Sequence, residues 1–255
     1  MASFQGKGVV ITGGAGEIGK AAAKLLASDG ADVLLVDCDA KALDAAVAEI
    51  GSKRVSACVA DVTDVASTQV YIRAAVDRFG GIDVLLSNAG IEGKVAPIVD
   101  ADPADFDRVI AVNVRGVWLS LKYAIPEIRK RGGGSIVISS SIAGLRGTAG
   151  VAPYVTSKHA VIGLMRAAAL ECAPFNIRVN TVNPSPVETR MMRSLEEGLM
   201  PGKAEEVHTM LKAMIPLQRY AESEDVAKLM RFLASDEAAF ITGSVYSVDG
   251  GFNAG

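Results

Sequence analysis

A tyrosine and a lysine stand four residues apart in the segment Tyr154–Lys158, whose sequence is YVTSK. On a helix, this spacing places the two side chains on one face. An ammonium beside a phenol stabilises the phenolate and is expected to lower the phenol pKa from its ordinary value of about 10. A tyrosine tuned in this way can exchange a proton with an alcohol near neutral pH. The spacing alone is common, and a surface Tyr–Lys pair is the alternative explanation.

A second pattern with chemical meaning lies near the N-terminus, where Gly14, Gly16 and Gly19 fit G-x-G-x-x-G. It follows an apolar stretch over 7–12 and opens an amphipathic stretch over 17–28, as a strand–turn–helix dinucleotide site requires. The glycines allow a tight turn and close backbone approach, and the helix N-terminus offers N–H groups to a pyrophosphate. The pattern therefore predicts a dinucleotide site, with an ordinary glycine-rich turn as the alternative.

Asp37 ends the next apolar stretch, 18 residues after Gly19. A carboxylate at this place accepts hydrogen bonds from the ribose hydroxyls of NAD and repels the 2′-phosphate of NADP. No Arg or Lys stands within three residues on either side to receive a phosphate. We therefore predict NAD as the cofactor. The alternative is that Asp37 caps the following helix, a role for which Asp39 is the better candidate.

Short apolar stretches alternate with longer amphipathic stretches along the whole chain. The predicted strands cover residues 7–12, 32–37, 54–59, 82–87, 135–139, 177–182 and 244–248. The predicted helices cover 17–28, 40–50, a segment capped by Thr63 and running to Phe79, 103–130 with a possible kink at Pro126, 153–172, an irregular region over 190–215, and 224–234. Strands that are apolar throughout and separated by helices indicate a parallel sheet covered on both faces. The predicted fold class is α/β, a doubly wound parallel sheet (Rossmann fold), in a single domain over 1–255.

The composition argues against several classes of protein. With 26 basic and 29 acidic residues and a net charge of −3, the chain offers no field that attracts nucleic acid or anionic membrane. No apolar run approaches the roughly 18 residues of a membrane span, and no N-terminal signal pattern stands out. Cys38, Cys58 and Cys172 are widely spaced and form no CxxC pair, so we expect neither disulfides nor a metal site. We expect a cytoplasmic protein without nucleic-acid or membrane partners.

Further motifs occur in an order and spacing typical of one family. They are Thr12-Gly13 with the glycine-rich loop, Asp61-Val62, Asn88-Ala89-Gly90, Asn113, Ser141, Tyr154 with Lys158, and Asn183-Pro184 leading to Thr189. In these motifs the chain resembles the short-chain dehydrogenase/reductase family, in its form of about 250 residues, over essentially its whole length. The resemblance implies an NAD-dependent oxidoreductase that interconverts a secondary alcohol and a ketone by hydride transfer.

The resemblance also implies four catalytic residues. Tyr154 would be the general acid/base, and Lys158 would lower its pKa and hold the nicotinamide ribose. Ser141 would hydrogen-bond the substrate oxygen, and Asn113 would hold a water that links Lys158 to solvent. Ser141 is preferred to the two serines before it because it lies 13 residues before Tyr154, as the family's serine does.

The cofactor contacts that the resemblance implies are spread over the whole chain. They are Gly13, Gly16, Glu17, Ile18, Gly19, Asp37, Asp61, Val62, Asn88, Ala89, Gly90, Tyr154, Lys158, Pro184, Val187 and Thr189. Two positions depart from the family pattern, since Glu17 and Ser185 stand where Gly is expected. An acidic side chain near a pyrophosphate is unfavourable unless it points to solvent or caps its own helix, and we expect Glu17 to serve the N-terminus of its own helix.

The segment after Thr189 is expected to form a substrate lid over about 190–215. It contains five of the eight Met residues of the chain, and flexible thioethers suit an adaptable apolar pocket, although ordinary helix packing explains them equally well. We expect a small apolar or mixed alcohol or ketone as substrate. The resemblance further implies a homotetramer, with contacts from residues 105–131, 153–172 and 248–252.

Two other functions stay open. A 3-oxoacyl-thioester (acyl-carrier-protein) reductase shares the fold and the catalytic set but usually takes NADPH, against which Asp37 speaks. A non-catalytic NAD-binding sensor or scaffold is a different class of protein. Such a protein has no reason to keep Asn113, Ser141, Tyr154 and Lys158 together.

Overall fold

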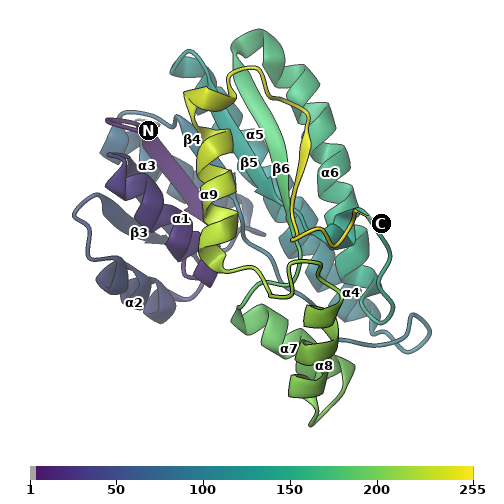
Figure 1. Ribbon diagram of the computed structural model, residues 1–255. Coiled ribbons are helices and arrows are strands. Elements are labelled where there is room, and N and C mark those ends of the chain that lie inside the picture. The colour runs from purple at the N-terminus through teal and green to yellow at the C-terminus, as the bar shows by residue number, and fades with distance from the viewer. Residues whose placement is uncertain (1–3, 255) are drawn as a thin grey trace.

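The computed structural model describes residues 4–254, which form a parallel sheet with helices on both faces (Figure 1). The seven strands follow the order β3-β2-β1-β4-β5-β6-β7. Their bounds are β1 Gly8–Thr12, β2 Asp32–Asp37, β3 Val55–Val59, β4 Val84–Ser87, β5 Gly134–Ser139, β6 Ile177–Pro184 and β7 Val245–Val248. The predicted α/β fold class in a single domain is confirmed.

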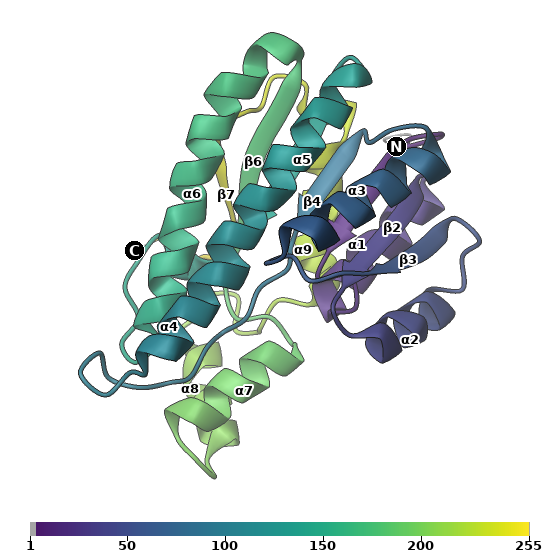
Figure 2. The same cartoon turned by 180° about the vertical axis from the view of Figure 1, so that it is seen from behind.

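Each face of the sheet is covered by its own set of helices. Helices α1 and α9 pack together on one face, and α3 and α5 pack together on the other, as the two opposite views show (Figures 1 and 2). The helix bounds are α1 Glu17–Ser28, α2 Ala40–Ile50, α3 Val65–Phe79, α4 Pro103–Ile110, α5 Gly116–Lys130, α6 Ala152–Cys172, α7 Arg190–Leu199, α8 Ala204–Ala213 and α9 Ser223–Ala234.

The alternation of side chains along the strands explains why the strands are apolar throughout. In β1, Val9 and Ile11 belong to the core cluster on one face, whereas Val10 belongs to the cluster on the other. In β2, Leu35 belongs to the same cluster as Val9 and Ile11, and Leu34 belongs to the cluster that contains Val10. Because successive strand residues point to opposite faces and both faces are buried, every position must be apolar.

The strand order changes direction between β1 and β4. From β1 the chain moves outward through β2 and β3, then returns to place β4 on the other side of β1. In open α/β sheets, ligands bind outside the carboxyl ends of the strands at such a switch point. Here those ends are Thr12 and Ser87, which pair with each other in the ladder. The glycine-rich loop and Asn88 follow them directly.

Three elements differ from the sequence-based expectation. Helix α3 is capped by Asp64, whose side chain accepts from the Ser67 N–H, and not by Thr63. The helical region expected over 103–130 is interrupted by a π-helical turn, η1, at Ala111–Arg115. Pro126 lies inside α5 without ending it. The irregular region over 190–215 consists of α7 and α8, which lie together at the carboxyl end of the sheet (Figure 1).

Within residues 4–254, no helix is long and apolar enough to cross a lipid bilayer.

Candidate active site

In the glycine-rich loop between β1 and α1, neighbouring atoms leave no room for a side chain at Gly13, Gly14 or Gly19. Gly13 has a φ of +64°, and a Cβ there would come within 2.8 Å of the Ala89 Cα. A Cβ on Gly14 would come within 2.8 Å of the Leu35 Cβ, and one on Gly19 would overlap the Gly13 carbonyl oxygen. The first turn of α1 therefore begins against bare backbone, with its N–H groups open to a ligand.

The carboxyl ends of β1, β4 and β5 are tied together by side-chain hydrogen bonds. The Thr12 hydroxyl accepts from the backbone N–H groups of Asn88 (3.0 Å) and Ala89 (3.2 Å). The Asn88 amide donates to the Gly13 carbonyl at 3.2 Å and accepts from the Ser139 hydroxyl at 2.9 Å. These bonds hold the glycine-rich loop and the carboxyl end of β5, just before Ser141, at fixed positions relative to each other.

Asp37 and Asp39 divide two roles between them. The Asp39 side chain accepts from the Ala42 N–H at 3.0 Å and caps α2, as expected. The Asp37 carboxylate accepts instead from the Ala15 N–H, at 3.3 Å, and from the Asp39 N–H, also at 3.3 Å. Asp37 thus lies against the glycine-rich loop, at the place where a dinucleotide ribose is expected.

Asp61 and Val62 lie after β3, near the same edge. The Asp61 carboxylate accepts from both the N–H and the hydroxyl of Thr63, each at 2.8 Å. Val62 is buried and packs against Gly116, where a Cβ would come within 2.9 Å of the Val62 Cγ2. The short loop after β3 is therefore fixed by a local turn and by contact with α5.

Tyr154 and Lys158 lie one turn apart in α6, as their spacing predicts. Lys158 is only 5% exposed, and its ammonium donates to the Ser139 carbonyl at 2.9 Å. The Lys158 Nζ lies 5.4 Å from the centre of the Tyr154 ring. Burial lowers the pKa of Lys158 to about 8.

The pKa of Tyr154 differs from the expectation. Burial raises it to about 12, and the Glu92 carboxylate adds to the rise, while a hydrogen bond with Ser141 lowers it. The predicted lowering by Lys158 is therefore wrong for this structure. The physical reason is that loss of solvent around the phenol outweighs the stabilisation of the phenolate by its neighbours.

The three consecutive serines have separate partners. Ser139 donates to the Asn88 side chain, and Ser140 donates to the Lys158 carbonyl at 2.9 Å. Ser141 accepts from the Ala143 N–H at 3.1 Å and is the serine that acts on the Tyr154 phenol. Ser141 is thus the serine that influences the Tyr154 phenol, and its catalytic role stays a prediction.

Asn113 lies in the π-helical turn and is 1% exposed. Its side chain exchanges two hydrogen bonds with the backbone of Ile91, at 2.8 and 2.9 Å, and donates to the Ser157 hydroxyl at 3.0 Å. A Cβ on Gly90 would lie 3.4 Å from the Asn113 Oδ1 and 3.5 Å from the Lys158 Nζ. Asn113 thus fixes the loop after β4 beside the lysine. Single π-helical turns are frequent at functional sites.

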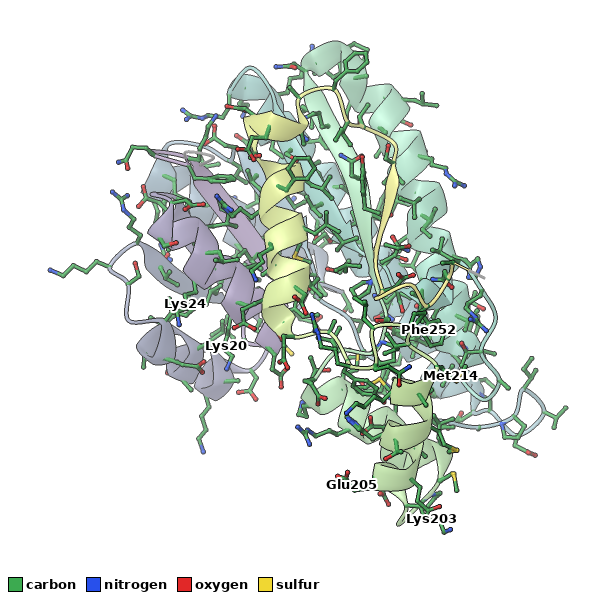
Figure 3. The ribbon with its side chains drawn as sticks, in the orientation of Figure 1. Lys20, Lys24, Lys203, Glu205, Met214 and Phe252 are labelled. Atoms are coloured by element: carbon green, nitrogen blue, oxygen red, sulfur yellow. The ribbon has the colours of Figure 1, made fainter. Side chains whose placement is uncertain are left out.

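A cavity of about 410 Å³ opens where these groups meet. Ile18 and Asn88 line its dinucleotide end, and α7 and α8 line the other end. Its lining includes Ser141, Ile142, Tyr154, Lys158, Pro184, Val187, Thr189, Met191, Met192, Leu195, Leu199, Leu211, Met214 and Phe252. Figure 3 shows Met214 and Phe252 where α8 meets the end of the sheet. The volume and the mostly apolar lining suit a small organic ligand.

Comparison with known proteins places the chain in a family. A family model described as enoyl-(acyl carrier protein) reductase matches residues 13–253. Levodione reductase of Leifsonia aquatica is 36% identical, with 98% of this chain and 96% of that protein covered. The crystal structure of levodione reductase superposes with a TM-score of 0.96, at 36% identity, over 98% of this chain and 99% of that one. The chain belongs to the short-chain dehydrogenase/reductase family. The predictions of the family and of an oxidoreductase are confirmed.

Other members of the family give the range of related activities. The 3-oxoacyl-[acyl-carrier-protein] reductase of Thermotoga maritima is 41% identical, with 97% of this chain and 98% of that protein covered. Cyclohexanol dehydrogenase of an Acinetobacter species is 37% identical, with 98% and 96% covered. The structure of an NAD+-bound xylitol dehydrogenase superposes with a TM-score of 0.90, at 33% identity, over 96% of this chain and 98% of that one.

In this short-chain dehydrogenase/reductase, Glu17 joins the glycine-rich loop to α7. Its carboxylate accepts from the Arg190 N–H at 3.1 Å, and Thr189 caps the same helix by accepting from the Met192 N–H at 3.3 Å. Glu17 therefore accepts a hydrogen bond at the N-terminus of α7, 173 residues away, and not only at its own helix as the sequence suggested. Sequence reasoning missed this pairing because nothing local indicates so distant a partner.

A buried polar cluster fixes α7 and α8 to the rest of the enzyme. Glu196 of α7 is 4% exposed, and its carboxylate accepts from the Tyr220 hydroxyl at 2.8 Å. His208 of α8 contacts the same oxygen through Nδ1 at 3.1 Å, and its ring lies 4.2 Å from the Tyr220 ring. The His208 Nε2 lies 3.6 Å from a Glu188 oxygen. Sequence reasoning missed this cluster, although His208 is one of only two histidines in the chain and could have drawn attention to it.

Replacing Tyr220 by Phe removes only the hydroxyl that donates to Glu196. We expect the free energy of unfolding to fall by about 1–3 kcal/mol, because a buried carboxylate loses a donor. Amide hydrogen exchange in α7 and α8 should accelerate at the same time. Equilibrium denaturation and exchange mass spectrometry measure the two effects.

Tyr246→Phe is the matched control, since no hydrogen bond to the Tyr246 hydroxyl is found within residues 4–254. Equal losses of stability in both variants, with unchanged exchange in α7 and α8, would refute the role of this cluster.

Proposed function

We propose that this chain is an NAD-dependent dehydrogenase/reductase that interconverts a secondary alcohol and a ketone, with Tyr154 as general acid/base. One observation carries the proposal. Ser141, Tyr154 and Lys158 line the same cavity, which continues to the dinucleotide loop at Ile18. The names levodione reductase and cyclohexanol dehydrogenase support a ketone and its secondary alcohol as the substrate pair.

The residues around the loop fit NAD. The exclusion of side chains at Gly13 and Gly14 leaves room for a close approach, and the α1 N-terminus suits a pyrophosphate. The Asp37 carboxylate at the end of β2 suits the two ribose hydroxyls and disfavours a phosphate. The NAD+-bound xylitol dehydrogenase bears out the prediction of NAD. When bound, NAD accepts or supplies the hydride.

The protein's own groups act on the proton and on the charge of the reacting oxygen. In oxidation, Tyr154 as phenolate accepts the proton of the substrate hydroxyl, while hydride leaves the carbon that carries this hydroxyl. In reduction, the Tyr154 and Ser141 hydroxyls donate to the carbonyl oxygen, where negative charge develops. The Lys158 ammonium, held by the Ser139 carbonyl 5.4 Å from the Tyr154 ring centre, would offset part of the cost that burial imposes on the phenolate.

The remaining expected roles belong to this proposal. Asn113 would hold a water that connects Lys158 to solvent, in addition to its contacts with Ile91. Asp61 and Val62 would flank the adenine. Pro184, Val187 and Thr189 would contact the nicotinamide end. The lid over about 190–215 would close the cavity above the substrate.

A homotetramer in the cytoplasm is part of the proposal as well. Its support is the exposure of large apolar side chains on the two helices expected at the interfaces, since Trp118 of α5 is 46% exposed and Leu170 of α6 is 80% exposed. Light scattering at micromolar concentration should give four times the mass of the 26.4 kDa chain. A monomeric mass would contradict the assembly.

A 3-oxoacyl-thioester reductase is the second candidate, favoured by the 41% identity to the Thermotoga maritima protein. The cofactor does not separate the two, because a Brucella melitensis 3-ketoacyl-(acyl-carrier-protein) reductase was crystallised with NADH. A panel of free ketones and acyl thioesters separates them. A sensor or scaffold protein would turn over neither.

Tyr154→Phe removes the proton-transfer group and keeps the ring. We expect kcat with NAD(H) to fall by about 10²- to 10⁴-fold, while the Kd for NADH stays nearly unchanged. Absorbance of the reduced nicotinamide measures turnover, with NAD and NADP tested separately, and fluorescence titration measures binding. Tyr246→Phe is the control. If Tyr154→Phe retains more than about a tenth of the wild-type kcat, the catalytic role of Tyr154 is wrong. If the wild-type kcat/KM with NADP(H) equals that with NAD(H), the cofactor assignment is wrong.

The pH dependence should differ between the two directions. Because burial raises the pKa of Tyr154 to about 12, the phenol form prevails at neutral pH. Ketone reduction needs this form and should keep its rate from pH 6 to 8. Alcohol oxidation needs the phenolate, so kcat/KM should rise with pH over the same range. The rise reports the titration of the coupled Tyr154–Lys158 pair, and a flat oxidation profile would contradict it.

A further inference from the structure

Among the described residues, the charged side chains of the cavity lining differ in their burial and in their partners. Among residues 4–254, the charged side chains that line the cavity are Lys158 and Arg146. Lys158 is buried and donates to a backbone carbonyl, so its ammonium is already engaged. Arg146 follows the loop that carries Ser141 and belongs to none of the ion pairs found in the part of the chain that the structure describes.

The guanidinium of Arg146 is held by an aromatic ring. Its central carbon lies 5.1 Å from the centre of the Phe252 ring, within the range of a cation–π contact. Phe252 lines the cavity as well. A guanidinium resting on an aromatic face keeps the N–H groups of its edge available, and their fork geometry matches a carboxylate.

Arg146 itself is exposed to solvent at the wall of the cavity. The cavity lining from α7 and α8 is apolar and includes Met192, Leu195 and Met214. This apolar lining suits the carbon frame of a ligand whose charged end lies at Arg146. The Glu92 carboxylate raises the pKa of the Tyr154 phenol, but Glu92 is not among the described residues that line the cavity.

We propose that the substrate carries an anionic group, a carboxylate, on an apolar carbon frame, and that Arg146 binds this group while Tyr154 and Ser141 hold the reacting oxygen. This inference rests on the proposed function and narrows it from any secondary alcohol or ketone to hydroxy and oxo acids. The reaction is unchanged. The alcohol carbon gives hydride to NAD+, its hydroxyl proton goes to Tyr154, and the carboxylate takes no part.

The test compares substrates that differ only in charge. The pair is 4-oxocyclohexanecarboxylate and 4-oxocyclohexanecarboxamide, reduced with NADH by wild type, Arg146→Gln and Arg146→Lys. We expect wild type to favour the acid by about 10- to 100-fold in kcat/KM, the range of a charged hydrogen bond. Arg146→Gln should abolish this preference while changing kcat/KM for the amide by less than about threefold, and Arg146→Lys should be intermediate.

Arg73→Gln is the matched control. Arg73 is exposed on α3, so the substitution removes the same charge at a place outside the cavity. It should leave the acid-to-amide ratio unchanged. Equal kcat/KM for acid and amide in wild type, or equal losses for both substrates in Arg146→Gln, overturns the inference. Turnover of the amide in those cases leaves the proposed function standing.

If no ketone is reduced, the proposed function fails, and the anion site at Arg146 is then tested by ligand binding alone. Calorimetric titration of cyclohexanecarboxylate and cyclohexanecarboxamide into the NADH-saturated protein then gives the two affinities. Tighter binding of the carboxylate, lost in Arg146→Gln and kept in Arg73→Gln, supports the anion site. Equal affinities overturn it.

Discussion

The buried ammonium of Lys158 is the constraint on which the rest of the site depends. Burying a cation is costly unless hydrogen bonds replace its water, and here the replacement is the Ser139 carbonyl at the end of β5 rather than a carboxylate. The cost appears as a pKa lowered to about 8. Among residues 4–254 no carboxylate forms an ion pair with the ammonium, which lies 5.4 Å from the centre of the Tyr154 ring, so a phenolate there would benefit from its charge. A carboxylate partner would make the lysine cheaper to bury and would weaken that field.

Such a cation stays in place only if the backbone around it is rigid. Ser140 bonds to the Lys158 carbonyl, and Ser139 bonds through Asn88 to the loop after β1. Asn113 fixes the loop after β4 through Ile91. Ser139 and Ser140 therefore serve the structure, whereas Ser141 is the serine proposed to bind the substrate oxygen. The glycine-rich loop and the helix that carries Tyr154 and Lys158 are parts of one hydrogen-bonded network at the switch point of the sheet.

Sequence reasoning predicted the parts of this arrangement that follow local rules. The continuous apolar runs of β1 and β2, the glycine-rich turn, the Asp39 cap and the spacing of Tyr154 and Lys158 all depend on neighbours in the chain. The π-helical turn at Asn113 was not predictable from composition, because it is a register change within an otherwise ordinary helical segment. The pKa of Tyr154 was misjudged because a sequence shows which charge is near and does not show how much water is lost. The Glu196–Tyr220 contact joins positions 24 residues apart through folding alone.

The position of Glu17 shows how a departure from a family pattern can be compensated by tertiary structure. A carboxylate beside a pyrophosphate site would repel the ligand, and a glycine would avoid that cost. Here the Glu17 carboxylate lies at two helix N-termini, in the first turn of α1 and against the Arg190 N–H of α7. Both helix dipoles stabilise a negative charge at this place. The same carboxylate therefore attaches the start of α7 to the dinucleotide loop, so that the helix covering the cavity begins from the element that would hold the cofactor. The Glu17 carboxylate disfavours a nearby pyrophosphate, but it also connects the glycine-rich loop directly to the helix that covers the cavity.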